Sequence, residues 1–113
     1  MLFAAQLGYL HSTPDGQSVN RMARITDGRY GLPELGHEKY LMDAFIASGM
    51  VAGDGSSMSW ADINAFSEAT NAVDDPFEKK ALFDMSRSYS TELSLGADPF
   101  RIAPCLREVN DNG

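Results

Sequence analysis

A chain of 113 residues, 43% of them hydrophobic, is long enough for one globular domain and too apolar to be disordered. Its 16 acidic and 9 basic residues give a net charge of -7, which argues against binding nucleic acid or an anionic membrane through positive charge. The single cysteine, Cys105, excludes an internal disulfide and fits a reducing compartment. The N-terminal apolar run follows no basic region and is too short to span a bilayer, so we expect one cytoplasmic domain over residues 1–113.

The N-terminal segment, residues 1–31, has the weakest pattern. Residues 2–10 fit a short helix or a buried strand, because short apolar runs do not separate the two. A turn composition follows at 12–16, and residues 18–25 allow one or two helical turns. Three glycines and a proline predict a loop over 26–36. We expect a helical segment here, although the pattern leaves its structure open.

A helix is predicted over residues 37–48, because its apolar residues share one face: Tyr40, Leu41, Ala44 and Phe45. Gly49 follows as a stop. The next stretch contains glycine, aspartate and serine over 53–57, a composition that predicts a flexible connector.

The next helix has a well-specified start at Ser59. A hydroxyl N-cap at Ser59 with Asp62 three residues later is the pattern of a capping box. Met58 and Ile63 stand at the two positions of a hydrophobic staple. These residues predict a helix over 60–71.

The last helix begins in the same way. Asp75 provides an acidic N-cap, Pro76 occupies the first helical position and Glu78 adds an acid in the first turn. A helix is predicted over 76–95, ending at Gly96 as a C′ glycine. Its apolar stripe consists of Phe77, Ala81, Leu82, Met85, Tyr89 and Leu93.

These elements together predict an all-α fold. Few β-branched residues occur, and no segment alternates strongly, which weighs against a sheet. We expect a small bundle of three main helices as a helical core over 32–95, with the N-terminal helical segment packed across it and an irregular tail over 97–113.

The residue types that carry chemistry are scattered. His11, His37 and Cys105 are far apart in the sequence, and no metal-binding or nucleophile motif is present. We therefore expect no catalytic residue, no metal and no cofactor, and a protein that is not an enzyme. A small-molecule or catalytic site would need a deep pocket containing His37 or Cys105.

An ordered set of features runs from residue 32 to residue 93. It consists of a leucine–proline start, a helix with an alanine–phenylalanine pair, a glycine-rich connector, a helix opening on serine and tryptophan, and a final helix with aromatic residues. The residues are Leu32-Pro33, Ala44-Phe45, Ser59-Trp60-Ala61-Asp62-Ile63 with Phe66, and then Phe77, Leu82, Met85 and Tyr89. The set resembles the tail assembly chaperones of long-tailed bacteriophages, which are small helical proteins encoded in the tail-morphogenesis region.

The resemblance implies a protein that binds other proteins and catalyses nothing. Such chaperones coat the long helical tape-measure protein before the tail tube polymerises, and they help to recruit tube subunits. A small acidic helical protein could cover apolar stripes of a tape-measure or tail tube protein and keep them soluble. We take as candidates for the apolar contact surface Tyr40, Phe45, Trp60, Phe66 and Tyr89.

Two alternatives remain open at this point. The candidate aromatic residues can instead fill the core, which is favoured for Trp60 because it lies beside Met58 and Ile63. The chain can also be a small acidic inhibitor, encoded by a phage, that mimics phosphates and blocks a host nucleic-acid-binding or defence protein. The acids available for that role are Asp62, Glu68, Asp74, Asp75, Glu78 and Asp84.

Overall fold

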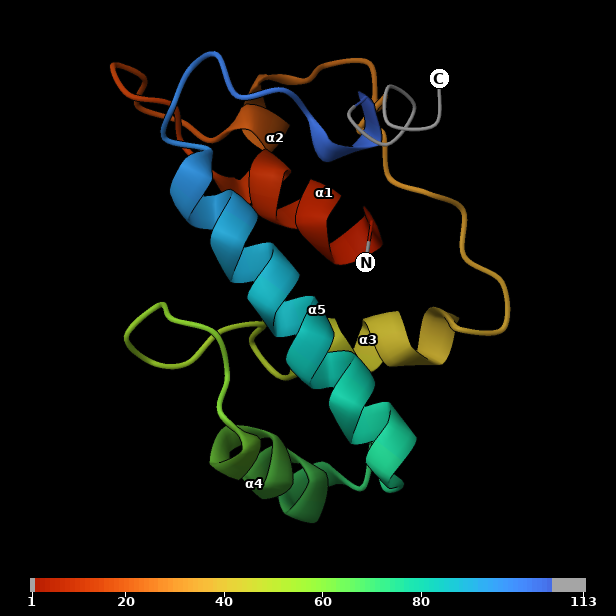
Figure 1. Cartoon of the computed structure of the whole chain (residues 1–113). Coiled ribbons are helices and arrows are strands. Elements are labelled where there is room, and N and C mark those ends of the chain that lie inside the picture. The colour runs from red at the N-terminus through yellow and green to blue at the C-terminus, as the bar shows by residue number, and fades with distance from the viewer. Residues whose placement is uncertain (1, 107–113) are drawn as a thin grey trace.

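The computed structural model describes residues 2–106, and this part of the chain is all-α, as predicted. Helices and loops make up the described residues, without a strand among them (Figure 1). The helices are, in chain order, α1 (Leu2–His11), α2 (Arg21–Arg24), α3 (Lys39–Ala47), α4 (Trp60–Thr70) and α5 (Pro76–Leu95).

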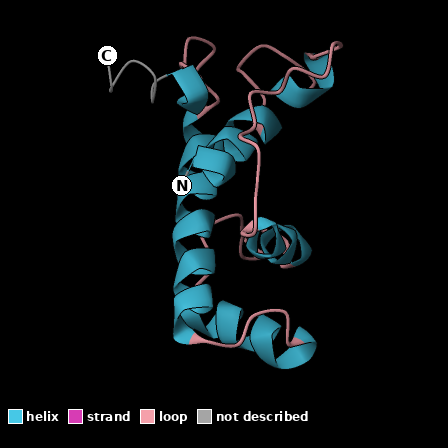
Figure 2. Ribbon diagram, turned by 90° about the vertical axis from the view of Figure 1, so that its right-hand side faces the viewer, coloured by secondary structure: helices cyan, strands magenta, loops and turns pink. Residues whose placement is uncertain are grey.

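The long helix α5 is the element on which the other main helices pack. Within residues 2–106, α1, α3 and α4 each contact α5, and α2 contacts α1. Seen from the side, α1, α3 and α4 extend to the same side of α5, and each contacts it at a different level along its length (Figure 2). The buried face of α5 contains Leu82, Met85 and Tyr89, as its apolar stripe predicts.

The N-terminal segment is part of the core and does not simply cover it. Residues 2–10, for which the sequence allowed helix or strand, form α1, and Ala4 and Leu7 belong to the main hydrophobic cluster. The two helices α1 and α5 come so close that a Cβ on Gly8 would overlap the backbone carbonyl of Tyr89. Glycine is therefore required at position 8 for this helix crossing.

Both capping boxes predicted from the sequence are present. Ser59 and Asp62 bond each other's backbone N–H at the start of α4, and Asp75 and Glu78 do the same at the start of α5. The residues of the predicted staple, Met58 and Ile63, are both buried. Helices α4 and α5 consequently begin at the residues that the sequence predicts.

The end of α5 differs from the prediction. Gly96 is the C-cap, and its φ of -68° is right-handed, so it is not a left-handed C′ glycine. A Cβ at this position would overlap the side chain of Ser12, which is buried at the end of α1. The glycine is thus explained by packing between the two chain segments and not by helix termination.

The predicted flexible connector is a loop held closed by α5. The Ser86 hydroxyl accepts the N–H of Met58 at 2.8 Å and donates to the carbonyl of Met50 at 2.8 Å. One buried side chain of α5 therefore joins the two ends of the loop. Inside the loop, the Ala52 N–H donates to the carbonyl of Ser56 at 2.8 Å.

The described part of the C-terminal tail packs back on the N-terminal half. It is irregular up to residue 103, as predicted, but residues 104–106 are helical, which differs from the prediction. Arg101 forms an ion pair with the buried Glu92 at 2.8 Å. The Cys105 N–H donates to the side-chain oxygen of Gln6 at 3.2 Å, and the Gln6 amide donates to the carbonyl of Tyr30 at 2.8 Å. The remainder of the predicted tail, residues 107–113, lies outside the described residues.

Candidate protein-binding surface

Two of the residues predicted to contact a partner belong to the core. Phe45 is 0% exposed and Tyr89 is 5% exposed. Their rings meet edge to face, with centroids 5.8 Å apart, at the contact of α3 with α5. Because both rings are covered by the protein itself, we remove them from the candidate surface. Phe45 shares the buried face of α3 with Leu41 and Ala44, and Tyr89 shares the buried face of α5 with Leu82 and Met85, which explains why both are buried.

Trp60 behaves in the opposite way, because 48% of it is exposed although core packing was favoured for this residue. Its ring stacks on the ring of Phe83, with centroids 4.2 Å apart and planes 3° from parallel. The guanidinium carbon of Arg87 lies 5.8 Å from the centre of the Phe83 ring. We call these three residues, Trp60, Phe83 and Arg87, the Trp60 surface.

The local structure explains why Trp60 faces outward. The cap at Ser59 places Trp60 in the first turn of α4, while Met58 and Ile63 occupy the positions that face the core. The ring of Trp60 is thus left at the edge of the α4–α5 contact, where the half-buried Phe83 supports it. Trp60 and its support come from different helices, so the surface exists only in the folded chain.

Sequence reasoning missed the other two members of this surface. Phe83 lies beside the apolar stripe of α5 and was not counted in it. The available signal was its spacing from Arg87, because residues four apart on a helix are neighbours on its surface. An aromatic and an arginine at this spacing indicate a stacked pair at the border of the buried face.

The other two predicted contact residues, Tyr40 and Phe66, have contacts of their own inside the protein. Tyr40 is 49% exposed at the α3–α5 contact, and its hydroxyl donates to the Glu78 carboxylate, an interaction that raises the pKa of Tyr40. Phe66 is half-buried and packs against the core cluster. Both residues are therefore explained in large part by contacts inside the protein.

The most enzyme-like pair of side chains joins α1 to α5. His11 Nδ1 lies 2.6 Å from the Tyr89 hydroxyl, and the two rings meet edge to face. Burial lowers the pKa of His11 and raises the pKa of Tyr89, so both groups are held in their neutral forms. The pair lies in the contact between α1 and α5, and its hydrogen bond and ring contact are explained by the packing of these two helices.

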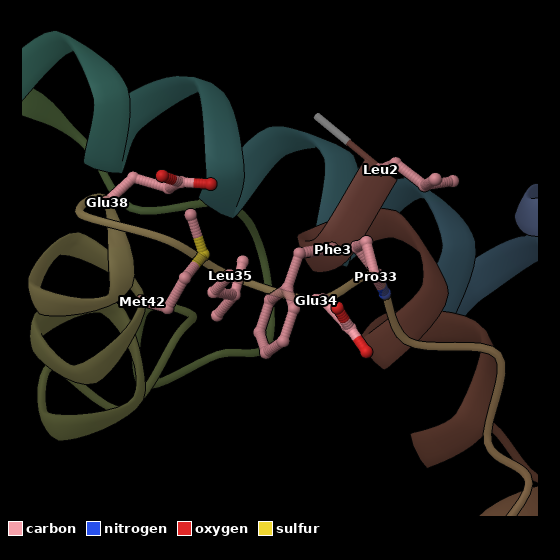
Figure 3. A pocket seen from close by; sticks show the side chains of 7 residues that line it. All are labelled: Leu2, Phe3, Pro33, Glu34, Leu35, Glu38 and Met42. Atoms are coloured by element: carbon pink, nitrogen blue, oxygen red, sulfur yellow. The ribbon is translucent and has the colours of Figure 1, made fainter.

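A pocket of about 160 Å³ lies between the start of α1, the loop at residues 33–35 and the start of α3 (Figure 3). Its lining consists of Leu2, Phe3, Pro33, Glu34, Leu35, Glu38 and Met42. Neither His37 nor Cys105 is part of this lining, so the pocket is not the catalytic or small-molecule site considered from the sequence.

Among residues 2–106, no three histidine, cysteine, aspartate or glutamate side chains form a group that could hold a metal ion. None of the helices in the same range has the length and apolar character needed to cross a bilayer. Comparison of the chain with protein-family models, with curated proteins and with solved structures found no match.

Proposed function

We propose that this protein binds another protein through the Trp60 surface and acts as an assembly chaperone of the phage-tail type in the host cytoplasm. In this role it shields an apolar helical stripe of a tape-measure or tail tube protein until assembly. The observation that carries the proposal is the half-exposed Trp60 stacked on Phe83. Tryptophan and arginine are the residue types that most often dominate the energy of protein–protein interfaces.

The Trp60 surface suits the shielding of an apolar helix. A rigid stack of two rings offers flat apolar area without losing much side-chain entropy on binding. Arg87 at its edge can bond a polar group that flanks the apolar stripe of the partner. The net charge of -7 would keep the complex soluble while the partner's apolar surface is covered.

The acidic residues support this role better than phosphate mimicry. Of the six acids considered for mimicry, four have local duties. Asp62, Asp75 and Glu78 form the capping boxes, and Asp84 pairs with Lys80 at 2.7 Å. Helix capping and one ion pair explain why these four carboxylates lie where they do. Their positions therefore do not favour the hypothesis that the protein mimics phosphates.

The single tryptophan makes the proposal directly testable. The protein is mixed with the tape-measure protein, or with the tail tube protein, encoded in the same genome, and Trp60 emission and co-elution on a sizing column are recorded. Binding at the Trp60 surface should shift the emission to shorter wavelength, because the ring leaves water. A stable complex without an emission change, or no complex with either protein, would refute the proposal.

A matched pair of variants locates the contact. Trp60→Ala should weaken the complex more than tenfold, since a central aromatic anchor contributes about 2 kcal/mol or more. Phe77→Ala is the control, because Phe77 is 74% exposed on α5 but is not part of the Trp60 surface. Equal losses for the two variants would argue against a specific contact at Trp60.

A further inference from the structure

The pocket between α1 and α3 combines apolar walls with a negative mouth. Its walls are formed by five apolar residues, Leu2, Phe3, Pro33, Leu35 and Met42, and its only charged lining residues are Glu34 and Glu38. In the close view the Glu38 carboxylate lies near Met42, whereas the Glu34 carboxylate lies beside Phe3 and Pro33 (Figure 3). An occupant should therefore be apolar in its centre and positively charged on its flanks.

The charge at the mouth persists at neutral pH. Backbone N–H groups of Glu38 and Gly36 lower the pKa of the Glu38 carboxyl, which favours its ionised form. His37 forms an ion-pair contact with Glu38, with its Nδ1 atom 3.8 Å from the Glu38 carboxylate. His37 is fully exposed and does not line the pocket, so it leaves the acidic character of the lining intact.

The volume limits what can enter. About 160 Å³ is close to the size of an engineered protein cavity that holds one benzene molecule. The pocket can thus accept one aromatic ring or one branched aliphatic side chain, while a longer apolar ligand would extend into solvent. Size and charge together describe a short peptide pattern of basic, apolar and basic residues.

We propose that this pocket docks a segment of a partner protein that inserts one side chain of phenylalanine or leucine size and flanks it with lysine or arginine. The inference rests on the proposed protein-binding function, but it uses residues outside the Trp60 surface. Two small and separate contacts on one partner would give a complex that is firm when both are engaged and releases when one is lost.

The probe for the pocket is the peptide acetyl-Lys-Phe-Lys-amide, titrated into ¹⁵N-labelled full-length protein by NMR. Shifts are expected at the backbone amides of Phe3, Glu34, Leu35 and Glu38. The peptides acetyl-Glu-Phe-Glu-amide and acetyl-Lys-Ala-Lys-amide should each bind at least about fivefold more weakly than acetyl-Lys-Phe-Lys-amide. The acidic peptide loses both ion pairs, and the alanine peptide loses the ring. Added salt should weaken the binding of both lysine-containing peptides, whereas it should not weaken the binding of acetyl-Glu-Phe-Glu-amide.

Variants separate the charge from the fold. Glu34→Gln with Glu38→Gln should lower the affinity for acetyl-Lys-Phe-Lys-amide about fivefold while the circular dichroism spectrum stays helical. Glu68→Gln on α4 removes an exposed acid far from the pocket in sequence and should change nothing. Equal binding of the acidic and basic peptides, or shifts at Trp60 and Phe83 in place of the pocket, would overturn the inference.

The two proposals fail in different ways. Trp60→Ala should lose the tape-measure or tube protein yet keep its affinity for acetyl-Lys-Phe-Lys-amide. If the basic peptide does not bind while Trp60→Ala still abolishes the large complex, the pocket inference is wrong and the proposed function stands. Phenethylamine binding as tightly as the peptide would show that the pocket accepts a free amine and overturn docking of a protein segment.

Discussion

His11 Nδ1 and the Tyr89 hydroxyl are 2.6 Å apart, although 78 positions separate the two residues in the chain. The Tyr89 ring also packs edge to face on Phe45 of α3. One tyrosine of α5 therefore connects α1 and α3, the two helices that border the acidic pocket. A substitution of Tyr89 or His11 should therefore lower the free energy of unfolding of the whole protein.

The stability of the protein should fall between pH 7.5 and pH 5.5 because of His11. Burial lowers the pKa of His11 in the folded state from its ordinary 6.5. The unfolded chain then binds more protons in this range, so the free energy of unfolding is fully retained above pH 6.5 and decreases as the pH falls toward the folded pKa. Urea denaturation at the two pH values measures the difference.

Two variants test whether His11 is the origin of this pH dependence. His11→Asn should reduce the loss of stability between pH 7.5 and pH 5.5, whereas His37→Asn should not, since His37 is fully exposed. The assignment to His11 is wrong if His11→Asn leaves the pH dependence unchanged.

Tyr89→Phe removes the hydrogen bond between Tyr89 and His11, and this loss should lower the free energy of unfolding by about 1 kcal/mol at pH 7.5.

Gly8→Ala should destabilise the protein even though alanine is the better helix former. The new Cβ would overlap the Tyr89 carbonyl, so α1 must move away from α5, at a cost of about 1–3 kcal/mol. Thermal or urea unfolding measures it. Gly53→Ala is the matched control, because nothing lies within 4 Å of a Cβ at that position. A Gly8→Ala protein as stable as the wild type would contradict the close crossing.

Ser86→Ala should loosen the loop that precedes α4. The substitution leaves the N–H of Met58 and the carbonyl of Met50 without their shared partner, which costs about 1–3 kcal/mol when such groups are buried. Hydrogen exchange at the Met58 amide should accelerate at the same time. Ser94→Ala, at an exposed position of the same helix, should change neither quantity.

Local patterns predicted the helices well because their determinants are local. Ser59 with Asp62, and Asp75 with Glu78, are three residues apart, and each pair alone fixes a helix start. The helix over 37–48 has no such cap, and the structure shortens it to Lys39–Ala47. Boundaries without a cap depend on tertiary packing, which the sequence pattern does not contain.

The candidate surface was harder to predict because it depends on contacts between distant residues. Trp60 is a candidate contact residue for which the sequence favours core packing, but its stacking partner Phe83 belongs to another helix and lies beside the stripe that periodicity selects. Phe45 and Tyr89 follow the buried face of their helices, so periodicity places them in the core. Amphipathic patterns thus predict which residues are buried. They do not predict which exposed ring stacks on a residue of another helix.

The two capping boxes should contribute separately and about equally to stability. Ser59→Ala and Asp75→Ala should each lower the free energy of unfolding by about 1 kcal/mol, because each leaves a first-turn N–H without its side-chain acceptor. Asp75→Asn keeps an acceptor and loses only the charge at the helix start, so its effect should be smaller. Asp74→Ala changes the net charge by the same amount as Asp75→Ala but spares the bond to the Glu78 N–H. Urea denaturation followed by circular dichroism ranks the four variants. Equal losses for Asp74→Ala and Asp75→Ala would mean that bulk charge, and not the cap, determines the stability of this helix start.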